Sequence, residues 1–170
     1  MLESNMQWTV PAAFALLVLA AVSGLAADLK DDPGGFDGVR WGTPALEMSG
    51  VALIREQADF KTFTRPGVPP SVCDITPERV KYQFFKDRLN LVIVSYRGKE
   101  THDTLVACAL RRYGPIPPMK PRTLLRVDWD GPATIVSLTY DPYTEEGTLS
   151  FSSRSINEEL FERFELKPGR

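Results

Sequence analysis

The alternation of hydrophobic and polar residues predicts a β-hairpin near the middle of the chain. Residues 79–85 (RVKYQFF) alternate, and residues 89–96 (LNLVIVSY) follow a short polar turn at 86–88. This is the pattern of two paired antiparallel strands. The second strand is apolar at four successive positions, 91–94. Such a run predicts a central strand that is covered on both faces.

Shorter patterns predict the remaining strands and one long loop. A proline-rich stretch at 66–77 is expected to form a loop, because proline has no N–H group for pairing. The other expected strands are each bounded by turn residues and lie at 36–41, within 51–64, and at 124–129, 133–140 and 148–153.

Helical spacing predicts three helices. The first is short and follows Thr43 and Pro44, which are favoured at the cap and first position of a helix. The second covers 101–113, and the pair Gly114-Pro115 ends it. The third begins at Ser155 with a capping-box pattern.

The order of these elements predicts an α+β fold, with a mainly antiparallel sheet and helices packed on it. A helix followed by a hairpin occurs twice, which raises the hypothesis of two related helix-plus-hairpin halves. Residues 36–166 are long enough for a single α+β domain. The polar residues 28–35 before it read as a flexible leader.

An apolar run at 8–27 predicts export. Its core, 10–22, has the length of a signal-peptide core, and small residues that suit cleavage precede Asp28. Residues 1–27 are therefore interpreted as a signal peptide, although no basic residue precedes the run. The alternative is an uncleaved anchor, which would be the only part of the chain in the membrane. The expected location is periplasmic or secreted.

The charge balance argues against nucleic acid as a partner. The chain has 20 basic and 22 acidic residues and a formal net charge of −2, whereas nucleic-acid binding requires a basic surface. The expected partner is an envelope protein or an anionic component of the envelope. A locally basic stretch formed by five residues is the candidate patch for an anionic partner; it comprises Arg111, Arg112, Lys120, Arg122 and Arg126. The alternative is a cationic helix end followed by a solvated loop.

Two cysteines, Cys73 and Cys108, are candidates for a disulfide if the protein is exported. On the predicted second helix, Cys108 points away from the apolar stripe, so a loop cysteine could reach it. Two buried free thiols are the alternative.

Catalytic motifs are few. The only histidine is His102, and the cysteines lack metal-binding spacing, so no metal and no cofactor are expected. A thiol at Cys73 or scattered carboxylates would serve an envelope enzyme, which is the alternative function.

The motif Gly38-Val39-Arg40-Trp41-Gly42-Thr43, followed by Glu47-Met48, resembles the opening of small exported bacterial proteins of unknown function. Those proteins begin with a G-[VI]-x-W-G-[ST] strand-to-helix motif. The resemblance implies a fold and export, and it implies no catalytic residues. We therefore expect a binding or interaction module of the bacterial envelope. A purely structural envelope protein remains a further alternative.

Overall fold

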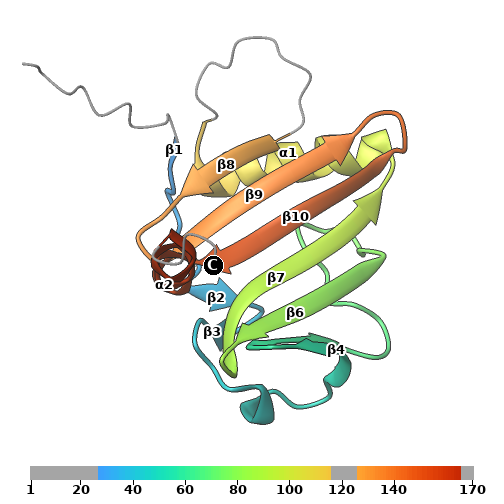
Figure 1. Cartoon of the computed structure of the whole chain (residues 1–170). Coiled ribbons are helices and arrows are strands. Elements are labelled where there is room, and N and C mark those ends of the chain that lie inside the picture. Colours follow the sequence, from blue (N-terminus) through green and yellow to red (C-terminus); the bar gives the residue numbers. More distant parts are fainter. Residues whose placement is uncertain (1–26, 116–125, 166–170) are drawn as a thin grey trace, which may run out of the picture.

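The computed structural model describes residues 27–115 and 126–165 (Figure 1). Ten strands, one 3₁₀ helix and two α-helices form these parts of the chain. In chain order they are β1 (Ala27–Asp28), β2 (Gly35–Phe36), β3 (Val39–Arg40), η1 (Ala45–Glu47), β4 (Ala52–Gln57), β5 (Phe60–Thr64), β6 (Arg79–Phe85), β7 (Arg88–Arg97), α1 (Lys99–Tyr113), β8 (Arg126–Asp130), β9 (Thr134–Asp141), β10 (Glu146–Ser153) and α2 (Arg154–Glu165).

The fold is α+β and mainly antiparallel, as the sequence predicts. The main sheet has eight strands in the order β1-β8-β9-β10-β7-β6-β5-β4, and β2 pairs with β3 in a separate small sheet. Only β1 runs parallel to its neighbour. A helical element followed by strands occurs twice, first as η1 with β4–β7 and then as α1 with β8–β10.

The central hairpin forms as predicted. β6 pairs with β7, and the turn between them lies at Lys86 and Asp87, which both have positive φ angles of 48° and 61°. Two such residues in succession match the right-handed twist of the strands they connect. Arg88, expected in the turn, begins β7 instead.

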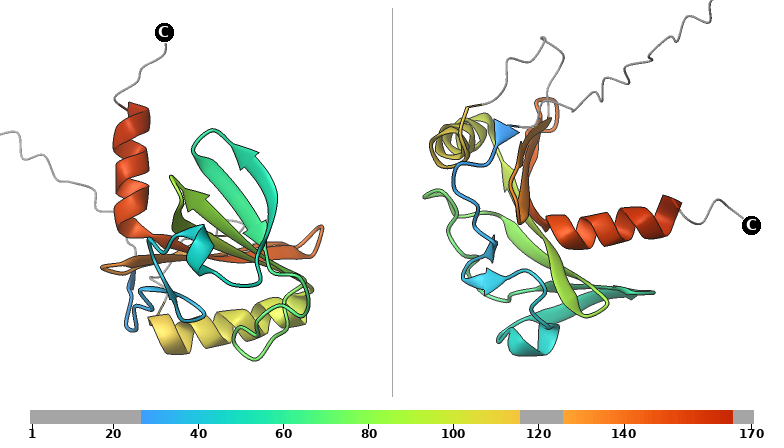
Figure 2. Two further views of the ribbon diagram at one scale, coloured as in Figure 1. Left: turned by 90° about the horizontal axis from the view of Figure 1, so that it is seen from below. Right: turned by 90° about the vertical axis from the view of Figure 1, so that its left-hand side faces the viewer.

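One face of the sheet forms the core. Alternate residues of β6, Val80, Tyr82 and Phe84, are almost fully buried there. α1 lies across this face and contributes buried Leu105 and Ala109, and Figure 2 shows α1 on one side of the sheet while α2 projects from the other. The strict alternation of β6 therefore corresponds to one buried face.

The expectation that β7 is covered on both faces is wrong. On β7 the side chains of Val92 and Val94 are fully buried in the core, whereas those of Leu91 and Ile93 are half-buried on the other face. β7 is central in the sheet, but only one of its faces is covered by the core. α2 begins directly after β10 and projects from this second face, and no other described helix lies over it.

The segment before β4 also differs from the expectation. Residues 36–41 do not form one strand, because Asp37 and Gly38 take positive φ angles of 50° and 77° and turn the chain back between β2 and β3. The predicted helix after Pro44 is a single 3₁₀ turn, η1, in which Ala45 alone is buried.

The predicted flexible leader at 28–35 is wrong, because this segment is part of the fold. β1 extends the sheet beyond β8, and Leu29 is buried. The carboxylate of Asp32 accepts hydrogen bonds from the backbone N–H groups of Ala133 and Thr134 at 2.6 and 3.1 Å. Burial alone would raise the pKa of Asp32, but the hydrogen bonds from Thr134, Ala133 and Gly34 lower it below its usual value.

Candidate functional site

The two cysteines are joined in a disulfide, so the predicted pairing is the one that the structure contains. Their Cα atoms are 5.9 Å apart, and the bond connects the loop between β5 and β6 to α1. Cys108 is buried on the helix. An enzyme that uses a Cys73 thiol is not compatible with this structure, because neither cysteine is free.

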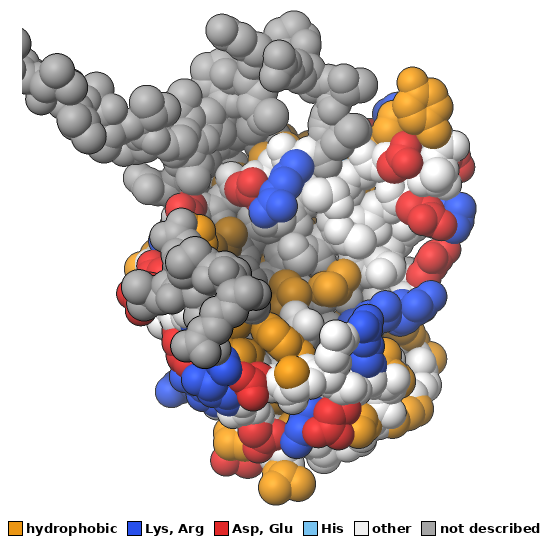
Figure 3. Space-filling view, viewed as in Figure 1, with side chains coloured by type: hydrophobic (Ala, Val, Ile, Leu, Met, Phe, Trp, Pro, Cys, Tyr) orange, Lys and Arg blue, Asp and Glu red, His pale blue; other side chains and the backbone are white. Residues whose placement is uncertain are grey.

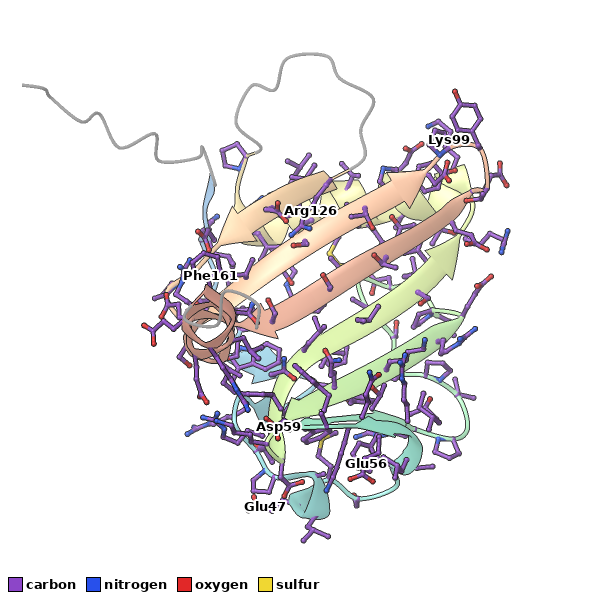
Figure 4. The ribbon with its side chains drawn as sticks, in the orientation of Figure 1. Glu47, Glu56, Asp59, Lys99, Arg126 and Phe161 are labelled. Atoms are coloured by element: carbon purple, nitrogen blue, oxygen red, sulfur yellow. A yellow bond between two sulfur atoms is a disulfide. The ribbon has the colours of Figure 1, made fainter. Side chains whose placement is uncertain are left out.

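The three described residues of the predicted basic patch do not lie on one surface. Arg111 and Arg112 lie at the end of α1 on the core side of the sheet. Arg126, labelled in Figure 4, lies on the opposite side, where its Nη2 contacts the Ser137 hydroxyl at 3.3 Å. Lys120 and Arg122 lie outside the described residues. Residues close in sequence are thus separated by the sheet itself.

The face of the sheet opposite α1 is rich in hydroxyl groups, and we call it the hydroxyl face. Its side chains alternate with core residues: on β10, for example, Ser150 lies between buried Leu149 and Phe151. Eight Ser and Thr residues define the hydroxyl face, namely Thr62, Thr64, Ser95, Ser137, Thr139, Thr148, Ser150 and Ser152. All but Ser137 are half-buried.

Strand register aligns part of the hydroxyl face into a row across five strands. Arg79 pairs with Ser95, Ser95 with Thr148, Thr148 with Thr139, and Thr139 with Arg126. Neighbouring members are therefore about 4.8 Å apart in the direction of strand pairing. The same residues line a cavity of about 550 Å³, which falls within the size range of ligand sites.

Three apolar side chains also lie on this face. Leu91 and Ile93 on β7 and Ile135 on β9 are half-buried, and β10 between them carries only small hydroxyl side chains on this side. Seen from this side, the surface is hollowed, with hydrophobic side chains near its middle (Figure 3). This face therefore presents apolar and hydroxyl side chains next to each other.

The strands on either side of the β7–β10–β9 part of the hydroxyl face, β6 and β8, differ in charge. On β8, Arg126 donates from Nε to both carboxylate oxygens of Asp128 at 2.9 Å, which balances its charge. On β6, Arg79 and Lys81 form no ion pair with any described residue. The positive charge on this face is therefore concentrated on the β6 side.

α2 borders the hydroxyl face at the end of β10. Asn157 donates a hydrogen bond to Ser152 at 2.9 Å. Farther along the helix, Glu159 accepts hydrogen bonds from Arg88 and Lys86 at the β6–β7 turn, and these lower the pKa of Glu159 to about 2. These polar contacts hold α2 in place although it projects from the sheet.

His102 belongs to an aromatic cluster on the core side, a role that the sequence pattern did not indicate. Its ring stacks on Tyr140 with the ring centroids 4.4 Å apart, and its Nδ1 lies 2.7 Å from the Tyr96 hydroxyl. That hydroxyl donates to the Thr139 carbonyl oxygen, so Nδ1 carries the proton shared with Tyr96. Burial lowers the pKa of His102 below its usual value.

The described parts of the chain contain neither a metal-binding cluster nor a membrane-spanning helix. Within 27–115 and 126–165, no three His, Cys, Asp or Glu side chains gather closely enough to hold a metal ion. No helix in these ranges combines the length and apolar character required to cross a membrane.

The fold and site define a small α+β protein with an exposed, concave sheet face. The chain matches no family model, no curated protein and no solved structure.

Proposed function

We propose that the protein is an exported binding module of the bacterial envelope, and that its hydroxyl face binds an exposed segment of a partner protein. The observation that carries this proposal is a concave face on which the apolar side chains of Leu91, Ile93 and Ile135 flank the small hydroxyl side chains of β10. Specific protein interfaces combine apolar groups that lose water on binding with polar groups that supply hydrogen bonds.

The charge distribution defines the partner segment further. Arg79 and Lys81 have no ion-pair partner in the described part of the chain, whereas Arg126 is balanced by Asp128. A partner segment with an acidic side chain directed toward β6 would match this asymmetry. Charge complementarity of this kind contributes mainly to specificity and to the rate of association.

Export is supported by two independent features. The apolar run at 8–27 has signal-peptide proportions, and the Cys73–Cys108 disulfide is of the kind that persists in oxidising compartments. The resemblance of the Gly38–Thr43 motif to small exported proteins agrees with both.

Site-specific photocrosslinking in the native cells tests the binding face. A photoreactive residue at Ser150, on the hydroxyl face, is expected to give one discrete protease-sensitive adduct. The matched control places it at Leu110, which is 38% exposed on α1 at the other side of the sheet, and should give none. Ile93→Asp, which puts a charge directly beside Ser150, should abolish the Ser150 adduct, and Lys81→Glu should weaken it.

Two results would overturn the proposed partner. Equal crosslinking from Ser150 and Leu110 would remove the hydroxyl face as the site. A Ser150 adduct that resists protease but is degraded by glycan hydrolases would identify a polysaccharide ligand instead of a protein.

Export has its own test, the intact mass of the protein from the periplasmic or secreted fraction. We expect a chain that begins near Asp28 and has two hydrogens fewer than the dithiol form. A cytoplasmic protein with residues 1–27 intact and both thiols reduced would contradict export.

A further inference from the structure

We infer that the α1 side of the molecule carries a second binding site, separate from the hydroxyl face, for an amphipathic oxyanion. The ligand class is a phosphate or carboxylate group attached to an apolar chain. The site is a cavity of about 460 Å³ between the β2–β3 hairpin, residues 70–73 and the end of α1. This volume is ordinary for a small-molecule site.

Two arginines supply the polar end of the cavity. Arg40 comes from β3 and Arg112 from the last turn of α1, and both are exposed at its edge. Neither forms an ion pair with a carboxylate among the described residues, whereas the other charged residue that lines the cavity, Asp37, is paired with Arg65 at 3.1 Å. The cavity therefore carries unbalanced positive charge.

The geometry of Arg112 suits it for anion recognition. Its guanidinium carbon lies 5.8 Å from the centre of the Tyr113 ring, so the side chain rests over an aromatic face. Such stacking restricts the side chain and leaves the N–H donors free for an oxyanion. Two guanidinium groups at one cavity provide the paired donors that carboxylates and phosphates bind best.

The remaining wall is apolar, which distinguishes the expected ligand from a bare ion. Phe36, Val39, Val72 and Phe151 line it, and the rings of Phe36 and Phe151 are in contact, with centroids 5.2 Å apart. An apolar chain that covers this wall would gain affinity by removing hydrophobic surface from water. A free inorganic anion would use only the arginines.

The disulfide connects the two sides of this cavity. Cys73 lines it from the loop, and Cys108 lies one helical turn before Arg112. The covalent bond therefore fixes the loop wall relative to the arginine on α1. Removing it should loosen the cavity while leaving the hydroxyl face unchanged.

Calorimetric titration with two probes at low ionic strength tests this site. Decyl phosphate is expected to bind at least tenfold more tightly than inorganic phosphate, because its chain covers the apolar wall. Arg40→Gln and Arg112→Gln should each weaken decyl phosphate binding by about tenfold or more, since each removes a charge-assisted hydrogen bond. Cys73→Ala/Cys108→Ala should also weaken it.

Matched controls separate this site from general charge effects. Arg111→Gln removes the same charge from the neighbouring position, which does not line the cavity, and should leave binding unchanged. Ser150→Ala on the hydroxyl face should do likewise. Circular dichroism confirms that each variant is folded.

Three outcomes would overturn the inference. Equal loss of binding in Arg111→Gln and Arg112→Gln would reduce the effect to net charge. Equal affinity for the two phosphates would remove the apolar chain from the ligand. Failure of the wild-type protein to bind decyl phosphate more tightly than neutral decanol would exclude the arginine pair as the anchor.

Discussion

The two faces of the main sheet use the same strands for different purposes. On β10, Leu149 and Phe151 are packed against the core at 1% and 3% exposure, whereas Ser150 and Ser152 between them stay half-buried on the hydroxyl face. The core face also carries α1, the disulfide and the aromatic cluster. The difference indicates that the contacts that stabilise the fold are concentrated on the core face, and the proposed binding function uses the other face.

The strongest test of this comparison changes neighbouring residues of one strand. Phe151→Ala should lower the unfolding free energy by about 3–5 kcal/mol, because it leaves a cavity beside Phe36 and Tyr113. Ser150→Ala should change it by less than about 0.5 kcal/mol. Urea denaturation of the two variants measures both values, and similar losses would contradict the division between the faces.

The disulfide should contribute slightly less. Cys73→Ala/Cys108→Ala removes a link between residues 35 apart in sequence, and a loop of this size is expected to contribute about 2–4 kcal/mol. A reductant should destabilise the wild-type protein by a similar amount and leave the variant unaffected. Full stability of the reduced wild-type protein would show that the core face does not depend on this link.

A substitution at Gly147 should lower the unfolding free energy by a smaller amount. At this residue a core side chain passes close to the backbone of β10. A Cβ atom at this residue would lie 2.1 Å from Cζ of Tyr96, so the tyrosine ring occupies the space that any other residue would need. Gly147→Ala should cost about 1–3 kcal/mol through overpacking. The near-ultraviolet spectrum should also change, because the ring must move, and an unaltered spectrum with full stability would contradict the close approach.

The smallest effect is a pH dependence from His102 on the core side. Because burial lowers its pKa in the folded protein, the unfolded chain takes up a proton at higher pH than the folded one. Stability from this group is complete above the unfolded pKa of about 6.5 and is lost as the pH falls through the folded pKa. Asp103 raises the pKa of His102 and moderates the effect, whereas Lys99 lowers the pKa and adds to it.

His102→Gln should flatten the dependence of unfolding free energy on pH between 8 and 5.5, because the chain has no other histidine. Asp32, whose lowered pKa acts only at more acidic pH, serves as the internal reference. An equal slope in wild type and variant would show that His102 does not titrate with unfolding.

The sequence could predict the strands and the core face, because alternation records which side of a strand is buried. Val80, Tyr82 and Phe84 are an example. The direction of Cys108 on its helix also pointed to a partner in a loop. The hydroxyl face could not be predicted in the same way. Its row from Arg79 to Arg126 depends on β10 lying between β7 and β9, and alternation within one strand does not specify strand order.

Two errors have physical causes of the same kind. The prediction of a basic patch relied on residues close in sequence sharing a surface. Arg126 instead projects from β8 on the side of the sheet opposite α1. The leader was read as flexible from its polar composition. It is held in place instead because Leu29 is buried in the core and the Asp32 carboxylate accepts hydrogen bonds from backbone N–H groups that are distant in sequence. Neither contact produces a periodic pattern of hydrophobic residues in the sequence.

The position of the disulfide along the chain bears on the order in which the molecule assembles. Residues 73–108 enclose β6, β7 and most of α1, whose contacts are short in sequence and therefore form quickly. β10 pairs with β7, but α1, β8 and β9 lie between the two strands in the sequence, so this pairing forms later. The covalent link can thus close around a nearly complete hairpin-and-helix unit, with β7 still presenting an unpaired edge to which the later strands add.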